Sequence, residues 1–240
     1  MATAGHFVEQ EDICNIVLPY IIIHNAVSVD GRIDWFAPDI GQFYELAARW
    51  KEDATLAGSN TIFNPEGEVS EEDEEAFEPP KRDPNDLRPL LVVPDSRGRV
   101  RNWHVLRKQP YWRDIVVLCS HTTPRTYIDY LKKRHIDYII AGDDHVDLRE
   151  ALEALNIRYG VKIIRVDSGG TLNGVLLRAG LVDEVSVLIN PCLVGGITPR
   201  SIFRAPDLTS SESVIQLRLT HVEKLGNQVV WLRYEVIRQG

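Results

Sequence analysis

Short apolar runs alternate along this chain with segments whose apolar residues recur at helical spacing. The runs are rich in β-branched residues, which predicts buried strands. They are Tyr20–Ile23, Ala54–Ala57, Leu90–Val93, Ile115–Cys119, Ile136–Ala141, Val161–Val166 and Val185–Ile189. Two alternating runs, Ser213–Glu223 and Gln228–Ile237, flank Gly226-Asn227 and predict an antiparallel hairpin. This order predicts an α/β fold with a mostly parallel central sheet, flanking helices and an antiparallel C-terminal hairpin.

Several helix boundaries are marked by residue type. Thr123-Pro124 predicts a helix start with Thr as N-cap and Pro at the first position. Asp147 with Glu150 predicts a capping box. Gly180 stands where the helix that follows Thr171 should end.

The stretch Val161–Gly196 organises the rest of the chain. Its strand runs into Asp167-Ser168-Gly169-Gly170-Thr171, and an apolar helix follows at once. Paired glycines at such a turn let a ligand approach the backbone, and the start of the helix suits a phosphate. A tight turn that needs glycine for its geometry alone is an equal alternative.

The whole segment closely resembles the C-terminal signature of the riboflavin-biosynthesis reductases, which have a dihydrofolate-reductase-like fold. The resemblance rests on Asp167, the two glycines, and three short motifs: Thr171-Leu172-Asn173, Leu181-Val182-Asp183-Glu184 and Pro191-Cys192-Leu193-Val194-Gly195-Gly196. Asp167 replaces the family's usual Glu, and Ser168 replaces a third glycine. The resemblance spans about residues 18–237 and implies a standalone reductase.

A second stretch matches the family's N-terminal motif, Ser-x-Asp-Gly-Lys. Here Ser28, Asp30 and Gly31 match, while Arg32 replaces Lys. The resemblance implies a pocket for substrate and nicotinamide, with His24 at its mouth. The residues expected to bind substrate are therefore His24, Asn25, Ser28 and Arg32.

Two further turns match the family's cofactor-binding positions. Gly58-Ser59-Asn60-Thr61 corresponds to a Gly-x-x-Thr turn that holds dinucleotide phosphates, and Ser96-Arg97 to a turn beside the adenosine ribose. A hydroxyl and a guanidinium there can hold a 2′-phosphate, which favours NADPH over NADH. The residues expected to bind the cofactor are Gly58, Ser59, Thr61, Ser96, Arg97, Gly169, Gly170, Thr171 and Leu172.

One domain is expected over residues 1–240, with an irregular arm at residues 1–15. Glu66–Asp86 is acidic and proline-rich. We therefore expect a solvated, disordered insertion that the fold does not need. It falls where relatives hold the substrate's phosphate. Arg82 and Arg88 are the candidates to replace those residues.

Composition and net charge argue against several classes of binding partner. A net charge of −8 argues against a nucleic-acid or anionic-membrane binder. No apolar run is long enough to span a membrane, and no secretory signal is visible. Three scattered cysteines suit a reducing cytosol, so a cytoplasmic enzyme is expected. Asp143-Asp144-His145 are neighbours in one loop and rarely supply convergent ligands, so no metal is expected.

The resemblance implies an NADPH-dependent oxidoreductase that reduces the ribosyl group of a ribosylaminopyrimidine 5′-phosphate to ribityl, working as a homodimer. Asp30 and Asp167 are the expected catalytic carboxylates, with a raised pKa that lets one of them supply a proton. A dihydrofolate or pterin reductase of the same fold stays open as an alternative. So does a non-catalytic nucleotide-binding module.

Overall fold

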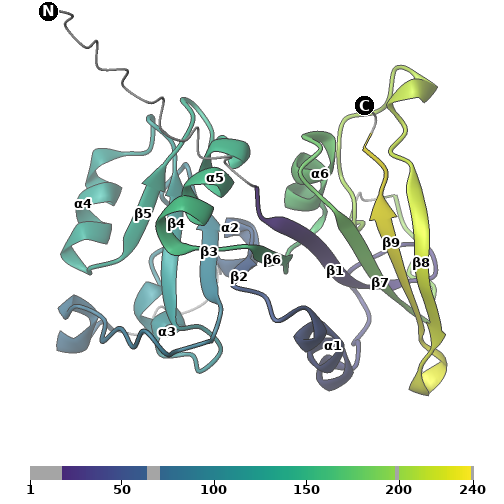
Figure 1. The fold of residues 1–240 in the computed structure, drawn as a ribbon, viewed down its shortest axis with the longest axis horizontal. Helices are drawn as coiled ribbons and strands as arrows, with labels where there is room; N and C mark the ends of the chain where they lie inside the picture. Colours follow the sequence, from purple (N-terminus) through teal and green to yellow (C-terminus); the bar gives the residue numbers. More distant parts are fainter. Residues whose placement is uncertain (1–17, 64–70, 198–199, 239–240) are drawn as a thin grey trace, which may run out of the picture.

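A single twisted sheet of nine strands runs through the molecule (Figure 1). The computed structural model describes residues 18–63, 71–197 and 200–238. The strands lie in the order β5-β4-β3-β2-β6-β1-β7-β9-β8. They are β1 (Tyr20–Ser28), β2 (Ala54–Leu56), β3 (Leu90–Pro94), β4 (Asp114–Cys119), β5 (Asp137–Ile140), β6 (Ile163–Val166), β7 (Glu184–Asn190), β8 (Leu217–Lys224) and β9 (Val230–Val236).

The direction of the strands confirms the fold class expected from the sequence. From β5 to β7 every neighbouring pair is parallel, while β7–β9 and β9–β8 are antiparallel. The C-terminal hairpin therefore extends the parallel sheet on one side, as predicted.

Helices cover both faces of the sheet. They are α1 (Ile40–Ala47), α2 (Ser59–Ile62), α3 (Trp103–Arg107), α4 (Arg125–Lys133), α5 (Leu148–Tyr159) and α6 (Gly170–Arg178), with 3-10 turns at Ala48–Trp50, Glu74–Phe77, Ser211–Ser213 and Gly226–Gln228. Leu152 of α5 and Leu176 of α6 are buried in the core on one face. Trp103 of α3 and Leu131 of α4 are buried on the other. Because both faces are covered, the strands read as nearly continuous apolar runs.

Three local predictions need correction or qualification. β1 does not end at Ile23 but continues to Ser28, because β7 pairs with it over Ile22–Ser28. The cap of α4 is Pro124, one residue later than predicted, since Thr123 uses its hydroxyl to accept from Ser120 N and donate to Ser96 O, each at 2.9 Å.

The capping box at α5 is half formed. Asp147 caps the helix by accepting from Glu150 N at 3.1 Å. The Glu150 carboxylate accepts from Gly142 N at 2.9 Å, so it ties down the preceding loop. Gly180 follows α6 with φ +65°, and the stop predicted there is confirmed.

The described part of the acidic insertion, residues 71–86, packs against the protein more than a solvated segment would. Ala76 is buried, and the ring of Phe77 lies under the Arg134 guanidinium at 5.0 Å. Glu72 pairs with Arg134. Arg82 pairs with Asp114 and Asp137. Residues 66–70 lie outside the described part of the chain, and whether the fold needs the segment stays a prediction.

No described helix is both long and apolar enough to cross a membrane. No group of three or more His, Cys, Asp or Glu side chains in the described ranges is placed to hold a metal ion.

Candidate functional site

A cavity of about 350 Å³ lies at the edge of the sheet where the parallel strands end. Four connections form it: the β2–α2 turn, the end of β3, the β5–α5 loop and the β6–α6 turn. We call it the strand-end pocket. The strand ends of open α/β sheets are where ligands bind. The lining includes the predicted cofactor residues Gly58, Ser59, Thr61, Ser96, Gly169, Gly170, Thr171 and Leu172.

Ser168 joins two walls of the strand-end pocket. Its hydroxyl oxygen accepts from Gly58 N at 3.2 Å, and its carbonyl accepts from Asn25 Nδ2 at 3.0 Å. A Cβ on Gly58 would lie 2.7 Å from the same hydroxyl. The serine that replaces the family's third glycine is therefore a connecting residue, and it requires glycine at position 58.

A buried carboxylate shapes the turn after β3. Asp95 is 1 % exposed and accepts from Arg99 N at 2.7 Å and Val100 N at 2.9 Å. The turn holds Ser96 at the strand-end pocket, because Ser96 O also accepts from the Thr123 hydroxyl.

The three arginines of this turn have different environments. Arg99 donates to Asn60 Oδ1 at 2.7 Å and to Ser59 Oγ at 3.2 Å, so it braces the β2–α2 turn. Arg101 lies over the rings of Tyr127 and Tyr130. Arg97 is exposed, and no described residue pairs with its guanidinium. It does not itself line the cavity but follows Ser96, which does.

Gly170, the second of the paired glycines, and Gly174 serve a close approach, but the approaching group is the protein itself. A Cβ on Gly170 would collide with Ser201 O, and one on Gly174 with Arg204 O. Residues 200–204, which we call the strap, lie here with their main chain directly on α6. The first N–H groups of α6 still face the pocket end of the helix without partners inside the helix.

Sequence reasoning missed the β5–α5 loop as part of the pocket. His145, Val146 and Leu148 line the cavity. Asp143-Asp144-His145 were considered only as candidate metal ligands. The loop carries no glycine motif that would predict a ligand-binding turn. The available signal was topological, because β5 ends at the same edge as β2, β3 and β6.

His24 does not lie at the mouth of a pocket, so that expectation is wrong. Its side chain is fully buried, with Nδ1 2.9 Å from Ser186 Oγ and Nε2 3.2 Å from Phe43 O. Burial lowers the pKa of His24 to about 4, so the ring is neutral near pH 7. Asn25, on the opposite face of β1, is also buried and bonds to Ser168 and Asn173.

Asp30 lies in a hydrogen-bonded turn. Its carboxylate accepts from the Ser28 hydroxyl at 2.6 Å, Val194 N at 3.1 Å and Gly195 N at 2.7 Å. These bonds lower the pKa of Asp30 to about 2, the reverse of the raised pKa expected for a proton donor. Arg32 lies beside it and donates to Gly196 O.

Asp167 has a different setting at the end of β6. Its Oδ2 accepts from Arg165 Nη1 and from the Tyr44 hydroxyl, both at 3.1 Å. Arg165 is itself buried and pairs with Glu52. Burial and the neighbouring Asp167 raise the pKa of Tyr44 to about 12, so its hydroxyl keeps its proton. Asp167 directly precedes the turn that lines the strand-end pocket.

The two carboxylates do not converge. Ile23 pairs with Val166, which puts Asp167 level with His24. β1 then runs four more residues to Ser28, a distance of about 13 Å along the strand, before the turn that carries Asp30. None of His24, Asn25, Ser28, Asp30 and Arg32 lines the strand-end pocket.

Comparison with known proteins identifies the family of this chain. The model of the RibD C-terminal domain matches residues 19–231. The chain belongs to the RibD C-terminal domain family. This assignment confirms the resemblance found in the sequence motifs.

Relatives and solved structures agree with the assignment. The chain is 29% identical over 221 residues, 88% of this chain and 96% of the relative, to the 2,5-diamino-6-ribosylamino-4(3H)-pyrimidinone 5′-phosphate reductase of Methanothermobacter thermautotrophicus. A pyrimidine reductase-like protein of Corynebacterium diphtheriae shares the fold with TM-score 0.65, 18% identity and coverage of 92% and 93%. RibD of Acinetobacter baumannii matches with TM-score 0.65 and 18% identity, covering 92% of this chain and 59% of that one.

Proposed function

We propose that this RibD-type chain is an NADPH-dependent reductase of riboflavin biosynthesis. Its substrate is a ribosylaminopyrimidine 5′-phosphate, whose ring-opened imine accepts a hydride at C1′ and a proton at nitrogen to give the ribitylamino product. The observation that carries the proposal is the strand-end pocket, where three separate motifs of the family meet.

The residues of the pocket suit a dinucleotide phosphate. Small residues and hydroxyls line it at Gly58, Ser59, Thr61 and Thr171, and the N-terminus of α6 points at it. Arg97 is the cation available for a 2′-phosphate, since Arg99 and Arg101 are engaged by the protein. When bound, NADPH supplies the hydride.

The chain's own residues have distinct roles in this proposal. Asp167, with Tyr44 and Arg165, lies next to the pocket lining and is the better-placed group to hold or relay a proton, because the Tyr44 hydroxyl is protonated and partly exposed. Asp30 positions the loop at Val194–Gly196 and keeps its charge near pH 7.

Neither Arg82 nor Arg88, the two candidates for binding the substrate's phosphate, is placed to do so. Arg82 pairs with Asp114 and Asp137, the first residues of β4 and β5. These strand starts lie at the edge of the sheet away from the strand-end pocket. Arg88 pairs with Asp86 in its own loop. Both arginines therefore serve the insertion and not the site.

We propose a homodimer formed through the hairpin. β8 is an edge strand, and Leu217, Leu219 and Val222 on it are 41 to 61 % exposed. A long, apolar edge is a surface that proteins usually pair or cover. A second copy of the chain can cover it.

The test is NADPH oxidation with purified enzyme and each candidate acceptor. Turnover with the 2-amino or 2-oxo ribosylaminopyrimidine phosphate and none with dihydrofolate is the expected result. Turnover of dihydrofolate alone would replace the proposal with a pterin-type reductase. Binding of NADPH without turnover of any acceptor would support a nucleotide-binding module.

A further inference from the structure

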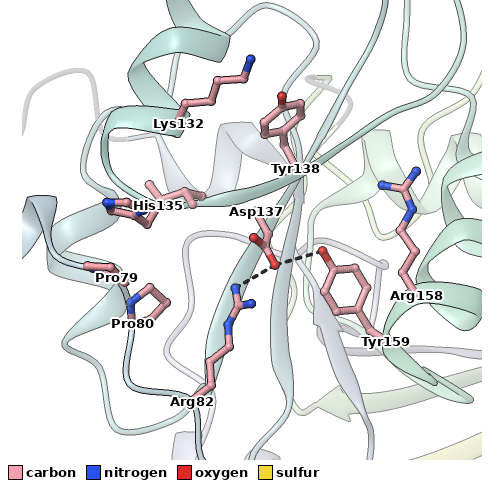
Figure 2. A pocket seen from close by; sticks show the side chains of 10 residues that line it. Pro79, Pro80, Arg82, Lys132, His135, Asp137, Tyr138, Arg158 and Tyr159 are labelled. Carbon is pink, nitrogen blue, oxygen red and sulfur yellow. Dashed lines mark hydrogen bonds and ion pairs between the residues drawn. The ribbon is translucent and has the colours of Figure 1, made fainter.

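A second, larger cavity lies at the opposite edge of the sheet, where β4 and β5 begin (Figure 2). Its volume is about 570 Å³, within the range of small-molecule sites. The insertion, the end of α4, β5 and the end of α5 form its walls. We call it the strand-start pocket.

The carboxylates at this edge are neutralised within the protein. Asp137 accepts from Arg82 Nη2 at 2.8 Å and from the Tyr159 hydroxyl at 3.1 Å (Figure 2). Asp114 accepts from Arg82 Nε at 2.9 Å. Arg82 therefore does not need a ligand, and neither do the two acids.

Two cations of the strand-start pocket remain without a counter-ion. Lys132 and Arg158 are exposed, and no described residue pairs with either. Figure 2 shows them on two sides of Tyr138, carried by α4 and α5. Arg107 lies behind the wall, where it donates to Arg134 O and His135 O. The lining of the strand-start pocket therefore carries three permanent cations, Arg82, Lys132 and Arg158, and one carboxylate, Asp137, in a protein whose net charge is −8.

Planar and partly apolar side chains complete the lining. They are Tyr138, Tyr159 and the Pro79-Pro80 pair, which Figure 2 shows on different sides of the pocket. Tyr159 is fixed by its bond to Asp137, so its ring is preorganised. Aromatic and proline surfaces of this kind suit a planar ring.

We propose that the strand-start pocket binds a phosphorylated small molecule of nucleotide size, with its phosphates on Lys132 and Arg158 and its ring against Tyr138 and Tyr159. The positive charge selects an anion, and the volume admits a group larger than free phosphate. The site is separate from the strand-end pocket, because the two lie at opposite ends of the strands, and it does not depend on the proposed reductase activity.

Titration calorimetry tests the site with inorganic pyrophosphate and ADP as probes. The titrations contain no NADPH, and only the heat that is lost when Lys132 and Arg158 are replaced is assigned to the strand-start pocket. Both probes should bind, ADP more tightly than pyrophosphate. The Lys132→Ala/Arg158→Ala variant should lose at least about tenfold in affinity for both, because each cation makes a charge-assisted hydrogen bond. Tyr138→Leu should weaken ADP alone.

The matched control removes the same charge elsewhere. Arg149→Ala/Lys224→Ala replaces two exposed cations outside the pocket and should leave both affinities within about twofold of the original protein. An equal loss in this control would show a general charge effect and overturn the proposal. So would unchanged binding in the Lys132/Arg158 variant, or no binding of either probe to the original protein.

Discussion

Arg97 differs from the two neighbouring arginines of its turn in having no partner within the described protein. It follows Ser96 at the strand-end pocket and has no protein partner among the described residues, whereas its neighbours Arg99 and Arg101 brace loops and aromatic rings. A guanidinium left free beside a cofactor pocket is available to a 2′-phosphate.

Replacing Arg97 by Ala should therefore weaken NADPH binding by roughly 10- to 100-fold and leave NADH binding nearly unchanged, since only NADPH carries the 2′-phosphate. Fluorescence titration of both cofactors measures the difference. Lys224→Ala is the control, because Lys224 is an exposed cation on the hairpin, outside both pockets. Equal losses of NADPH and NADH in Arg97→Ala would contradict the assignment.

Asp30 should act as a loop anchor that is charged throughout the working pH range. Asp30→Asn weakens the bonds to Val194 and Gly195, so turnover should fall while the pH profile between pH 5 and 8 keeps its shape. A proton donor would instead remove one limb of the profile. The pH dependence of kcat for the original enzyme and Asp30→Asn distinguishes the two roles.

His24 makes stability depend on pH. Its folded pKa of about 4 lies below the ordinary value of 6.5, so the unfolded chain binds the extra proton first as the pH falls. The stabilisation is complete above pH 6.5 and is lost progressively down to pH 4, by about 2–3 kcal/mol. Urea unfolding at pH 7.5 and pH 5 measures it. His24→Gln should show a smaller difference between these two values, and an unchanged difference would exclude His24 as its source.

Most residues that line the strand-end pocket were predictable from the sequence, whereas the surroundings of His24 and Asp30 were not. Gly58 and Gly169 stand in local motifs whose spacing is visible in the sequence. His24 was misplaced because β1 is covered on both faces, so no alternation tells which face a side chain enters. The low pKa of Asp30 depends first on the Ser28 hydroxyl, two residues away, and then on N–H groups 164 and 165 residues away. No local pattern contains the contribution of those distant N–H groups.

At the scale of elements, the insertion is attached to the turn that carries Arg97. Glu72 pairs with Arg134, whose guanidinium lies 3.6 Å from the ring centre of Tyr130. The Tyr130 hydroxyl donates to Arg101 O at 2.6 Å. Composition alone suggested a solvated segment, because single aromatic and charged residues that pack on a helix leave no periodic signal.

Arg82→Ala should test how much the insertion stabilises the fold. The change leaves Asp114 buried without its ion pair, so we expect a loss of roughly 1–2 kcal/mol in the free energy of unfolding, limited by the exposure of Arg82. Arg88→Ala, which removes an ion pair within the insertion's own loop, is the control and should cost less. Denaturant unfolding measures both, and equal stability of Arg82→Ala and the original protein would show that the attachment is weak.

At the scale of the whole molecule, the proposed dimer depends on the edge strand. Leu219→Lys places a charge on β8 where the side chain is 52 % exposed in one copy. The protomer should keep its fold, and the dimer should dissociate at micromolar concentration in sedimentation analysis. Ile157→Lys, which places the same charge on α5 at a side chain that is 64 % exposed, is the control. A monomeric original protein would remove the dimer proposal.

The order of elements and the class of sheet were readable because each strand is a compact apolar run bounded by turn residues. The order of the strands within the sheet could not be predicted in this way. β2 lies between β3 and β6, and those two strands are separated by more than sixty residues in the sequence. The family resemblance indicated the fold class, and no strand order was predicted.

The contact between α6 and the strap limits how the site can change. Gly170 and Gly174 meet the main chain of Ser201 and Arg204, and main-chain atoms cannot be made smaller by a second substitution. The strap also joins the turn after β1, where Ile202 N donates to Gly31 O. Chimaeras between relatives should consequently work only when α6, the strap and that turn are transplanted as one module, and libraries that vary any one of the three alone should yield mostly inactive clones.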